Sequence, residues 1–265
     1  MVIAITILGI VGGLSALIID RTVDGYDATA RRAKLHSGAR LAIDRITREV
    51  RHALPNSICT YNGSTCNSVA DRVYFLKSRE GSEYQTLTGN YTNGNPRAPL
   101  PVFPATASSF DVLSTDSLNA SINDWVVVYN TNNTSIYNVG STKRRQINSI
   151  TTKAVDASNN VQVINFLSAT YFNGHSPSRR FQIIQDNATL FYLSGTDLFR
   201  ATSAITSPNT PTGIPRLLLE NVTALNFSYI AGTQQRASVL RIDLTITVKG
   251  ESIHIIHEAH IQNAA

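Results

Sequence analysis

The sequence predicts an α+β fold, in which one long N-terminal α-helix packs on an antiparallel β-sheet head. Residues 1–19 carry no charge and no proline. Residues 39–54 then repeat apolar side chains at helical spacing, and from residue 56 onward short apolar runs alternate with Asn, Gly, Ser, Thr and Pro. We therefore expect three parts: a membrane half of the helix at 1–19, an amphipathic half at 20–54 and an antiparallel β head at 55–265.

The first part, Met1 to Ile19, reads MVIAITILGIVGGLSALII. At about 1.5 Å per residue, an uncharged helix of this length approaches the ~30 Å thickness of a bilayer core. We expect it to cross a membrane once. The large apolar residues expected to contact lipid or neighbouring helices are Ile3, Ile7, Ile10, Leu14 and Leu17.

The second part, Asp20 to Leu54, is polar with one apolar stripe. Its apolar residues recur at three- and four-residue steps, as on one face of a helix. Those expected to pack against the head are Ile43, Ile46, Val50 and Leu54. Charged residues lie largely off the stripe, and the spacing of Asp44 with Arg48 and of Arg45 with Glu49 permits weak ion pairs. Pro55 is expected to end the helix.

Whole-chain composition bounds the function. The chain has 265 residues, 42% hydrophobic content and a formal net charge of +5. Residues 20–54 hold eight Lys and Arg against five Asp and Glu. This excess is weak support for contact with anionic lipid. The rest of the chain holds fifteen Lys and Arg against thirteen Asp and Glu, an excess too small to indicate nucleic-acid binding.

The two cysteines, Cys59 and Cys66, flank an Asn62-Gly63 pair, the strongest short hairpin signal. Counting outward from a two-residue turn places the cysteines opposite each other, within disulfide reach. A disulfide implies an oxidising compartment. The alternative is two unpaired thiols in a cytosolic loop.

The head is expected to be antiparallel, with a final hairpin turning at Gly250-Glu251. Within Val239–Val248 every second residue is apolar, which predicts one buried face. Gly89–Pro104 and Thr202–Pro215 are too long for turns and are interpreted as surface excursions of one domain. The expected strands are Arg72–Lys77, Ser109–Leu113, Trp125–Tyr129, Val161–Leu167, Phe181–Gln185, Thr189–Leu193, Leu217–Leu219, Ala224–Tyr229, Val239–Val248 and Ser252–Gln262.

No residue pattern indicates catalysis. On a strand His254 and His260 share one face with Glu258, while His257 faces the other way, so the three histidines cannot converge on a metal. The Gly140–Lys143 run lacks the first glycine of a phosphate-binding loop and is interpreted as a hairpin loop. His175 and Ser176 are adjacent on a loop, where their working atoms rarely meet. We expect no catalytic, cofactor or metal site.

Two stretches carry a family resemblance. The first is ARLAIDRITREVRHALPNS at 39–57, and the second is SPSRRFQII at 176–184, followed by LFY at 190–192 and DLFR at 197–200. With the N-terminal helix they resemble type IV pilins and type II secretion pseudopilins, most closely the MshO family of minor pilins from MSHA pilus biogenesis. LLLENV at 217–222 with LNFSY at 225–229 is similar to J-type pseudopilins and W-type minor pilins.

The resemblance implies a structural role. Such a protein enters the inner membrane with its head in the periplasm, joins other minor pilins and the major pilin through an inner-membrane assembly platform, and primes or caps a surface pilus. Family chains begin with a processed, methylated aromatic residue followed by Thr-Leu-x-Glu. Because MVIAITILGIVGG resembles sequence just after that glutamate, we expect the start at Met1 to be truncated or misassigned. The alternatives are a stalk-displayed adhesin, a type II secretion pseudopilin and a signal-anchored periplasmic enzyme.

Overall fold

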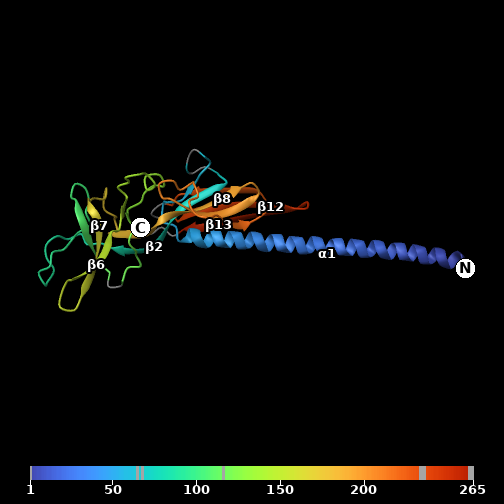
Figure 1. Cartoon of the computed structure of the whole chain (residues 1–265), viewed down its shortest axis with the longest axis horizontal. Coiled ribbons are helices and arrows are strands. Elements are labelled where there is room, and N and C mark those ends of the chain that lie inside the picture. The colour runs from blue at the N-terminus through green and yellow to red at the C-terminus, as the bar shows by residue number, and fades with distance from the viewer. Residues whose placement is uncertain (1, 64–65, 67–68, 115–116, 233–236, 262–265) are drawn as a thin grey trace.

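The chain is described by a computed structural model covering residues 2–63, 66, 69–114, 117–232 and 237–261. One continuous helix, α1 (Val2–Arg51), runs from the N-terminus into a β head (Figure 1). Its 50 residues correspond to about 75 Å. The predicted α+β layout, a long N-terminal helix with a mostly antiparallel β head, is therefore present.

The strands in the described residues form three antiparallel sheets. The largest has the order β1-β2-β8-β4-β5, with β9 pairing β8 and β10 pairing β9. The other two have the orders β11-β12-β13 and β3-β7-β6. The bounds are β1 Cys59–Thr60, β2 Arg72–Glu83, β3 Ala107–Val112, β4 Trp125–Val128, β5 Arg144–Gln146, β6 Ser149–Ala154, β7 Asn160–Thr170, β8 Arg180–Ser194, β9 Asp197–Ser203, β10 Arg216–Leu219, β11 Val222–Ile230, β12 Ser238–Val248 and β13 Glu251–Ile261.

Strand β8 corrects the prediction of separate strands at 181–185 and 189–193. Both segments pair with β2, through Ile183 with Glu80 and Leu190 with Tyr74, so they belong to one strand. The polar residues between them fall where the register against β2 shifts, beyond Leu76. A bulge, and not a turn, therefore absorbs the polar interruption.

The β12–β13 hairpin has the expected alternation but a different turn. Every second residue of β12 from Leu240 to Ile246 is buried, as predicted. Val248 pairs with Glu251, so the turn is Lys249-Gly250, one residue earlier than expected. Both turn residues have positive φ, 49° and 82°, which suits a tight antiparallel hairpin and a glycine at its second position.

The second half of α1 packs against β12, β13, β10 and β2. Ile43, Ile46 and Val50 lie with buried residues of these strands in one hydrophobic core. Gly38 does not break the helix: a Cβ there would lie 3.4 Å from a Leu219 methyl, so the glycine accommodates the close approach of β10.

The helix ends at Arg51, three residues before the expected end at Leu54. The His52 carbonyl accepts from Ser78 N at 2.9 Å, and Leu54 N donates to Leu76 O at 2.7 Å. Pairing with β2 replaces the last helical turn. Leu54 is buried, but in a different cluster from Ile43, Ile46 and Val50.

The sheet β3-β7-β6 lies at the end of the molecule opposite the N-terminus (Figure 1), and we call it, with loop 89–104, the distal lobe. Phe110 and Ile164 of this lobe share a core with Phe181 of β8, so the lobe packs on the end of the large sheet. Leu100, from the loop expected to be a surface excursion, is buried in that core. In loop 202–215, Ile205 is 4% exposed and joins a third cluster, so both long loops add side chains to the interior.

Candidate assembly site: the stalk helix and its junction with the head

The N-terminal half of α1 stands outside the head. Ile3, Ile7 and Ile10 are 75%, 56% and 63% exposed. Leu14 and Leu17, predicted with them, have side chains outside the described residues. By length and composition this is the one helix in the described chain suited to cross a membrane. A bare apolar helix of this size requires lipid or a protein partner.

Contact between head and helix begins at the hairpin turn. Arg32 donates to both carboxylate oxygens of Glu251, through Nε at 2.6 Å and Nη2 at 3.0 Å. Glu251 follows directly on the Lys249-Gly250 turn. A bidentate Arg–carboxylate pair fixes both the orientation and the separation of the two side chains. The pair therefore fixes the β12–β13 turn against α1 at Arg32.

Glu49 forms a charged cluster at the edge of the helix–head core. It is 6% exposed and contacts Arg45 Nε at 2.8 Å, Lys77 Nζ at 2.8 Å and Arg200 Nη2 at 3.1 Å. Burial raises the pKa of Glu49, but hydrogen bonds from Lys77, Arg45 and Arg200 outweigh it and lower the pKa to about 2. The cluster ties α1, β2 and β9 together.

The Glu49 cluster bears on two predictions: which of the two expected ion pairs forms, and whether Glu49 is exposed. The Arg45–Glu49 pair forms, whereas Asp44 and Arg48 make no ion pair within the described residues. The sequence pattern places Glu49 off the apolar stripe, on a face expected to meet solvent or a neighbouring subunit. It is buried because β2 and β9 bring two cations to that flank of the helix, and the stripe alone gives no sign of them.

The segment after the helix is held by the loop that follows β4. Asn130 Nδ2 donates to Pro55 O at 3.0 Å and Asn56 O at 2.9 Å, while Asn133 Nδ2 donates to Ile58 O at 3.0 Å. Asn56 has a φ of 56°, which asparagine tolerates better than most residues. Side-chain amides thus satisfy the backbone where the chain leaves the helix.

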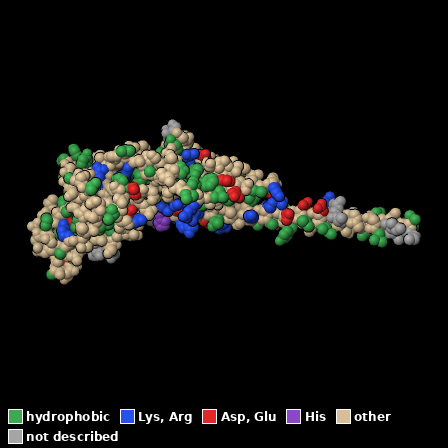
Figure 2. Space-filling view, in the orientation of Figure 1, with side chains coloured by type: hydrophobic (Ala, Val, Ile, Leu, Met, Phe, Trp, Pro, Cys, Tyr) green, Lys and Arg blue, Asp and Glu red, His purple; other side chains and the backbone are tan. Residues whose placement is uncertain are grey.

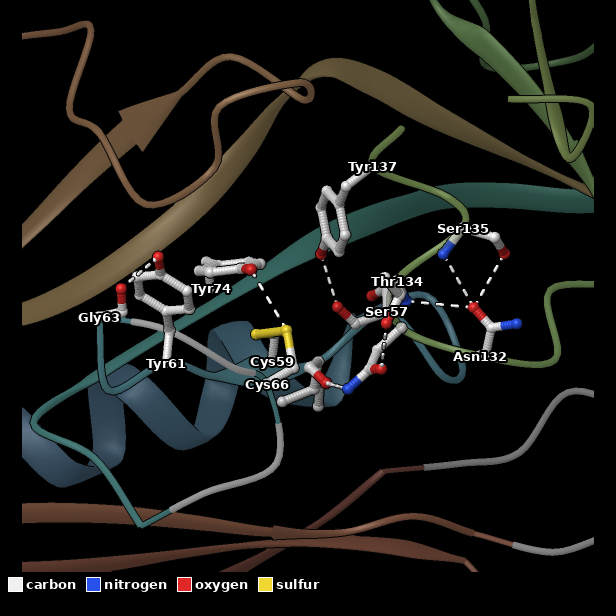
Figure 3. Close-up of a disulfide and its surroundings, with 12 residues drawn as sticks. Ser57, Cys59, Tyr61, Gly63, Cys66, Tyr74, Asn132, Thr134, Ser135 and Tyr137 are labelled. Atoms are coloured by element: carbon white, nitrogen blue, oxygen red, sulfur yellow. Dashed lines mark hydrogen bonds between the residues drawn. A yellow bond between two sulfur atoms is a disulfide. The ribbon is translucent and has the colours of Figure 1, made fainter. Parts of the chain in front are cut away.

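The disulfide Cys59–Cys66 lies beside this segment (Figure 3), with a Cα–Cα distance of 5.0 Å. Tyr74 packs next to it, with its hydroxyl 3.3 Å from Cys66 Sγ. Tyr137 meets Tyr74 edge to face at 5.1 Å and donates to Ser57 O at 2.5 Å. Burial raises the pKa of Tyr74 to about 12.

The hairpin register predicted around the cysteines is wrong. Cys66 pairs with Tyr61, while Cys59 pairs with Tyr74 of β2. Gly63 has a φ of 100° but Asn62 is not in the positive region, so the turn is not the two-residue type that Asn-Gly favours. Ser64 and Thr65, which a two-residue turn would pair with Tyr61 and Thr60, lie outside the described residues. β2 takes the strand position opposite Cys59, so Cys66 is bonded to Cys59 without being its strand partner.

The residues weighed for metal or catalytic chemistry lie apart or have other partners. His254 Nε2 is 2.7 Å from Asp243 Oδ1 on the exposed sheet face, whereas His257 faces the opposite side of β13. No three His, Cys, Asp or Glu residues in the described ranges are placed to hold a metal. His175 Nδ1 lies 3.3 Å from the Tyr84 hydroxyl, and Ser176 Oγ lies 3.1 Å from Ser178 Oγ. Gly140–Lys143 lies in the loop that joins the paired strands β4 and β5.

Comparison with known proteins adds no relative: no family model, no curated protein and no solved structure matches this chain.

Proposed function

We propose that this chain is a minor pilin: a structural subunit that primes or caps a type IV, MSHA-like pilus. The main support is that the two halves of α1 have different surroundings. Its first half is apolar and bare, and its second half is fixed to an antiparallel head by Ile43, Ile46, Val50 and the Glu49 cluster. Such a helix suits both storage in a membrane and packing beside other helices once withdrawn from it.

In this proposal the protein waits in the inner membrane with its head in the periplasm, where the Cys59–Cys66 disulfide is stable. An inner-membrane assembly platform then moves it into a filament with other minor pilins and the major pilin. Its role is structural and not enzymatic. A type II secretion pseudopilin would use the same geometry in a periplasmic filament.

The distal lobe favours a position at the filament tip. It extends beyond the helix at the end opposite the N-terminus (Figure 1). Heads bearing such a lobe would collide if repeated along a shaft, whereas a single copy at the end escapes the collision. We therefore expect low copy number and tip location.

The test is deletion of the gene with a count of surface filaments. We expect loss or strong reduction, with the major subunit retained in the membrane, and restoration by the wild-type gene. Ile7→Asp/Ile10→Asp should fail to restore filaments because two carboxylates block use of the apolar half. Leu167→Asp is the matched control, since Leu167 is 87% exposed on the distal lobe.

Gold-labelled antibody against the head, applied to sheared filaments, tests the position. Label at one end supports tip location, and label along the shaft contradicts it. Normal filament numbers in the deletion strain would contradict the priming role.

The second candidate is an adhesin displayed on the same stalk. It is favoured by the exposed apolar side chains of the distal lobe, including Phe103 at 63% and Leu167 at 87%. This role predicts normal filaments that no longer attach to their target surface after Leu167→Asp.

A further inference from the structure

Lys153 and Asp111 are in contact inside the distal lobe. Lys153 lies on β6 and Asp111 on β3, on opposite sides of β7, and Asp111 is 0% exposed. Lys153 Nζ lies 2.6 Å from Asp111 Oδ1 and 2.7 Å from Oδ2, and it also donates to Pro96 O at 2.8 Å. A nitrogen at these distances from both oxygens lies about 3 Å from the carbon they share, the separation of two atoms poised to react.

The two carboxylate oxygens of Asp111 have different partners. Oδ2 accepts hydrogen bonds from the Tyr91 hydroxyl and the Ala98 backbone N–H, both at 2.9 Å. Oδ1 is buried and accepts no hydrogen bond within the described residues, although Lys153 Nζ lies beside it. Buried oxygens in folded proteins are nearly always hydrogen-bonded, so an ordinary ion pair does not account for Oδ1.

The other lysine ion pair in the described part of the chain, Lys77 with Glu49, has different surroundings. Although burial raises the pKa of Glu49, hydrogen bonds from Lys77 and two arginines lower it to about 2, so this carboxylate stays charged. Asp111 makes an ion pair with Lys153 alone among the described residues, and few charged side chains are visible on the distal lobe in Figure 2. Transfer of one proton from Lys153 to Asp111 therefore replaces two poorly solvated charges by a neutral pair.

We propose that Lys153 and Asp111 form an intramolecular isopeptide bond. One ammonium proton passes from Nζ to Oδ1, and the neutral amine then attacks Cγ, while Tyr91 and Ala98 stabilise the negative charge that develops on Oδ2. A second proton passes from the nitrogen to Oδ1, the Cγ–Oδ1 bond breaks, and Oδ1 leaves as water. One ammonium and one carboxylate thus become one amide and one water, with no other reactant.

Proximity and burial favour this reaction. Groups held in reacting geometry behave as if present at ~10⁵–10⁸ M, which offsets the preference of free amines and acids to remain unlinked in water. The Lys153 side chain is 21% exposed and that of Asp111 0%, so little water reaches the amide. The bond joins the two outer strands of the β3-β7-β6 sheet, which then cannot separate unless a covalent bond breaks.

The intact mass of the full chain tests the bond. The chain is purified unfolded, refolded in detergent and followed over time by mass spectrometry. We expect it to lose one water, about 18 Da, in addition to the two hydrogens of the disulfide. Trypsin should then release one branched peptide that joins residues 98–143 to residues 146–179.

Four variants locate the reaction. Lys153→Arg keeps the cation but removes the amine, so it should lose no water, whereas the matched control Lys77→Arg should lose water as the wild type does. Tyr91→Phe keeps the ring but removes one donor to Oδ2, so it should slow the loss of water at least about tenfold. Tyr171→Phe, at a tyrosine that packs on Phe103, should leave the rate unchanged.

A wild-type mass that stays at the sequence value less two hydrogens would overturn the proposal, because the contact would then be an ion pair only. Loss of water that persists in Lys153→Arg would place the reaction elsewhere and overturn it as well. Equal rates for Tyr91→Phe and the wild type would overturn the role given to Oδ2. The proposal does not rest on the pilus assignment, since the mass is measured on the isolated chain.

Discussion

Residues 2–19 and residues 39–51 of α1 have the same secondary structure and opposite surroundings. Ile3, Ile7 and Ile10 are more than half exposed, whereas Ile43, Ile46 and Val50 are at most 3% exposed. The isoleucines are chemically alike, so the difference comes from what covers them. The head supplies the second half with a sheet, and the first half must obtain its cover from outside the chain.

The largest effect is expected in the bare half. Ile7→Asp/Ile10→Asp should abolish membrane association, because each aspartate near a membrane-helix centre costs about 2.5–3.5 kcal/mol. Alkaline extraction of membranes followed by immunoblotting measures it. Leu41→Asp, at an exposed apolar residue of the docked half, is the control and should remain in the membrane fraction. Equal extraction of both variants would remove the contrast between the halves.

In the docked half, Ile46→Ala should lower the free energy of unfolding by about 2–5 kcal/mol, because a fully buried isoleucine leaves a cavity. Leu41→Ala should change it by less than about 0.5 kcal/mol. Denaturant unfolding in detergent, followed by circular dichroism, compares them. If the two variants lose the same stability, Ile46 is not in the head's core.

Glu49 should make the docked half sensitive to acid. Its pKa of about 2 lies below the ordinary 4.5, so between these values the unfolded state binds more protons and stability falls as the pH falls. The stabilisation is complete above about pH 4.5 and amounts to at most about 3 kcal/mol. The stability difference between wild type and Glu49→Gln should therefore shrink as the pH drops from 4.5 to 2. A constant difference over this range would show that the cluster does not hold the carboxylate ionised.

The smallest effect is expected at the disulfide. Titration of the unfolded, unreduced protein should find no free thiol, and Cys59→Ala/Cys66→Ala should cost about 2–3 kcal/mol from the short closed loop. The bare half should be unaffected, so membrane extraction of this variant should match the wild type. Two reactive thiols would refute both the bond and the oxidising compartment.

The sequence correctly predicted features that depend only on residues close together in the chain. The helical period of residues 39–50 and the alternation of Leu240 to Ile246 each appear in the structure. Features that depend on distant strands were missed. Glu49 is buried by Lys77 and Arg200, and the turn-like residues 185–187 lie in a bulge because β2 pairs on both sides of them.

The same limit applies at the junction. Cys59 and Cys66 were correctly joined, but their hairpin register was wrong because β2 competes for the edge of Cys59. Leu41 lies off the apolar stripe, and the head leaves its side of the helix exposed.

Because the head first holds the helix at the Arg32–Glu251 pair, the helix before Arg32 forms a rigid stalk. From Ile19 to Arg32 the helix runs about 20 Å without support from the head, and it continues unbroken for about 28 Å more to Arg51. A rigid rod converts rotation into displacement. A tilt of about 20°, ordinary for a membrane helix, would therefore carry the far end of the stalk about 16 Å sideways. In the proposed membrane-bound state, the head would therefore reach an area of the membrane surface much larger than the cross-section of the helix, with every contact between helix and sheet intact.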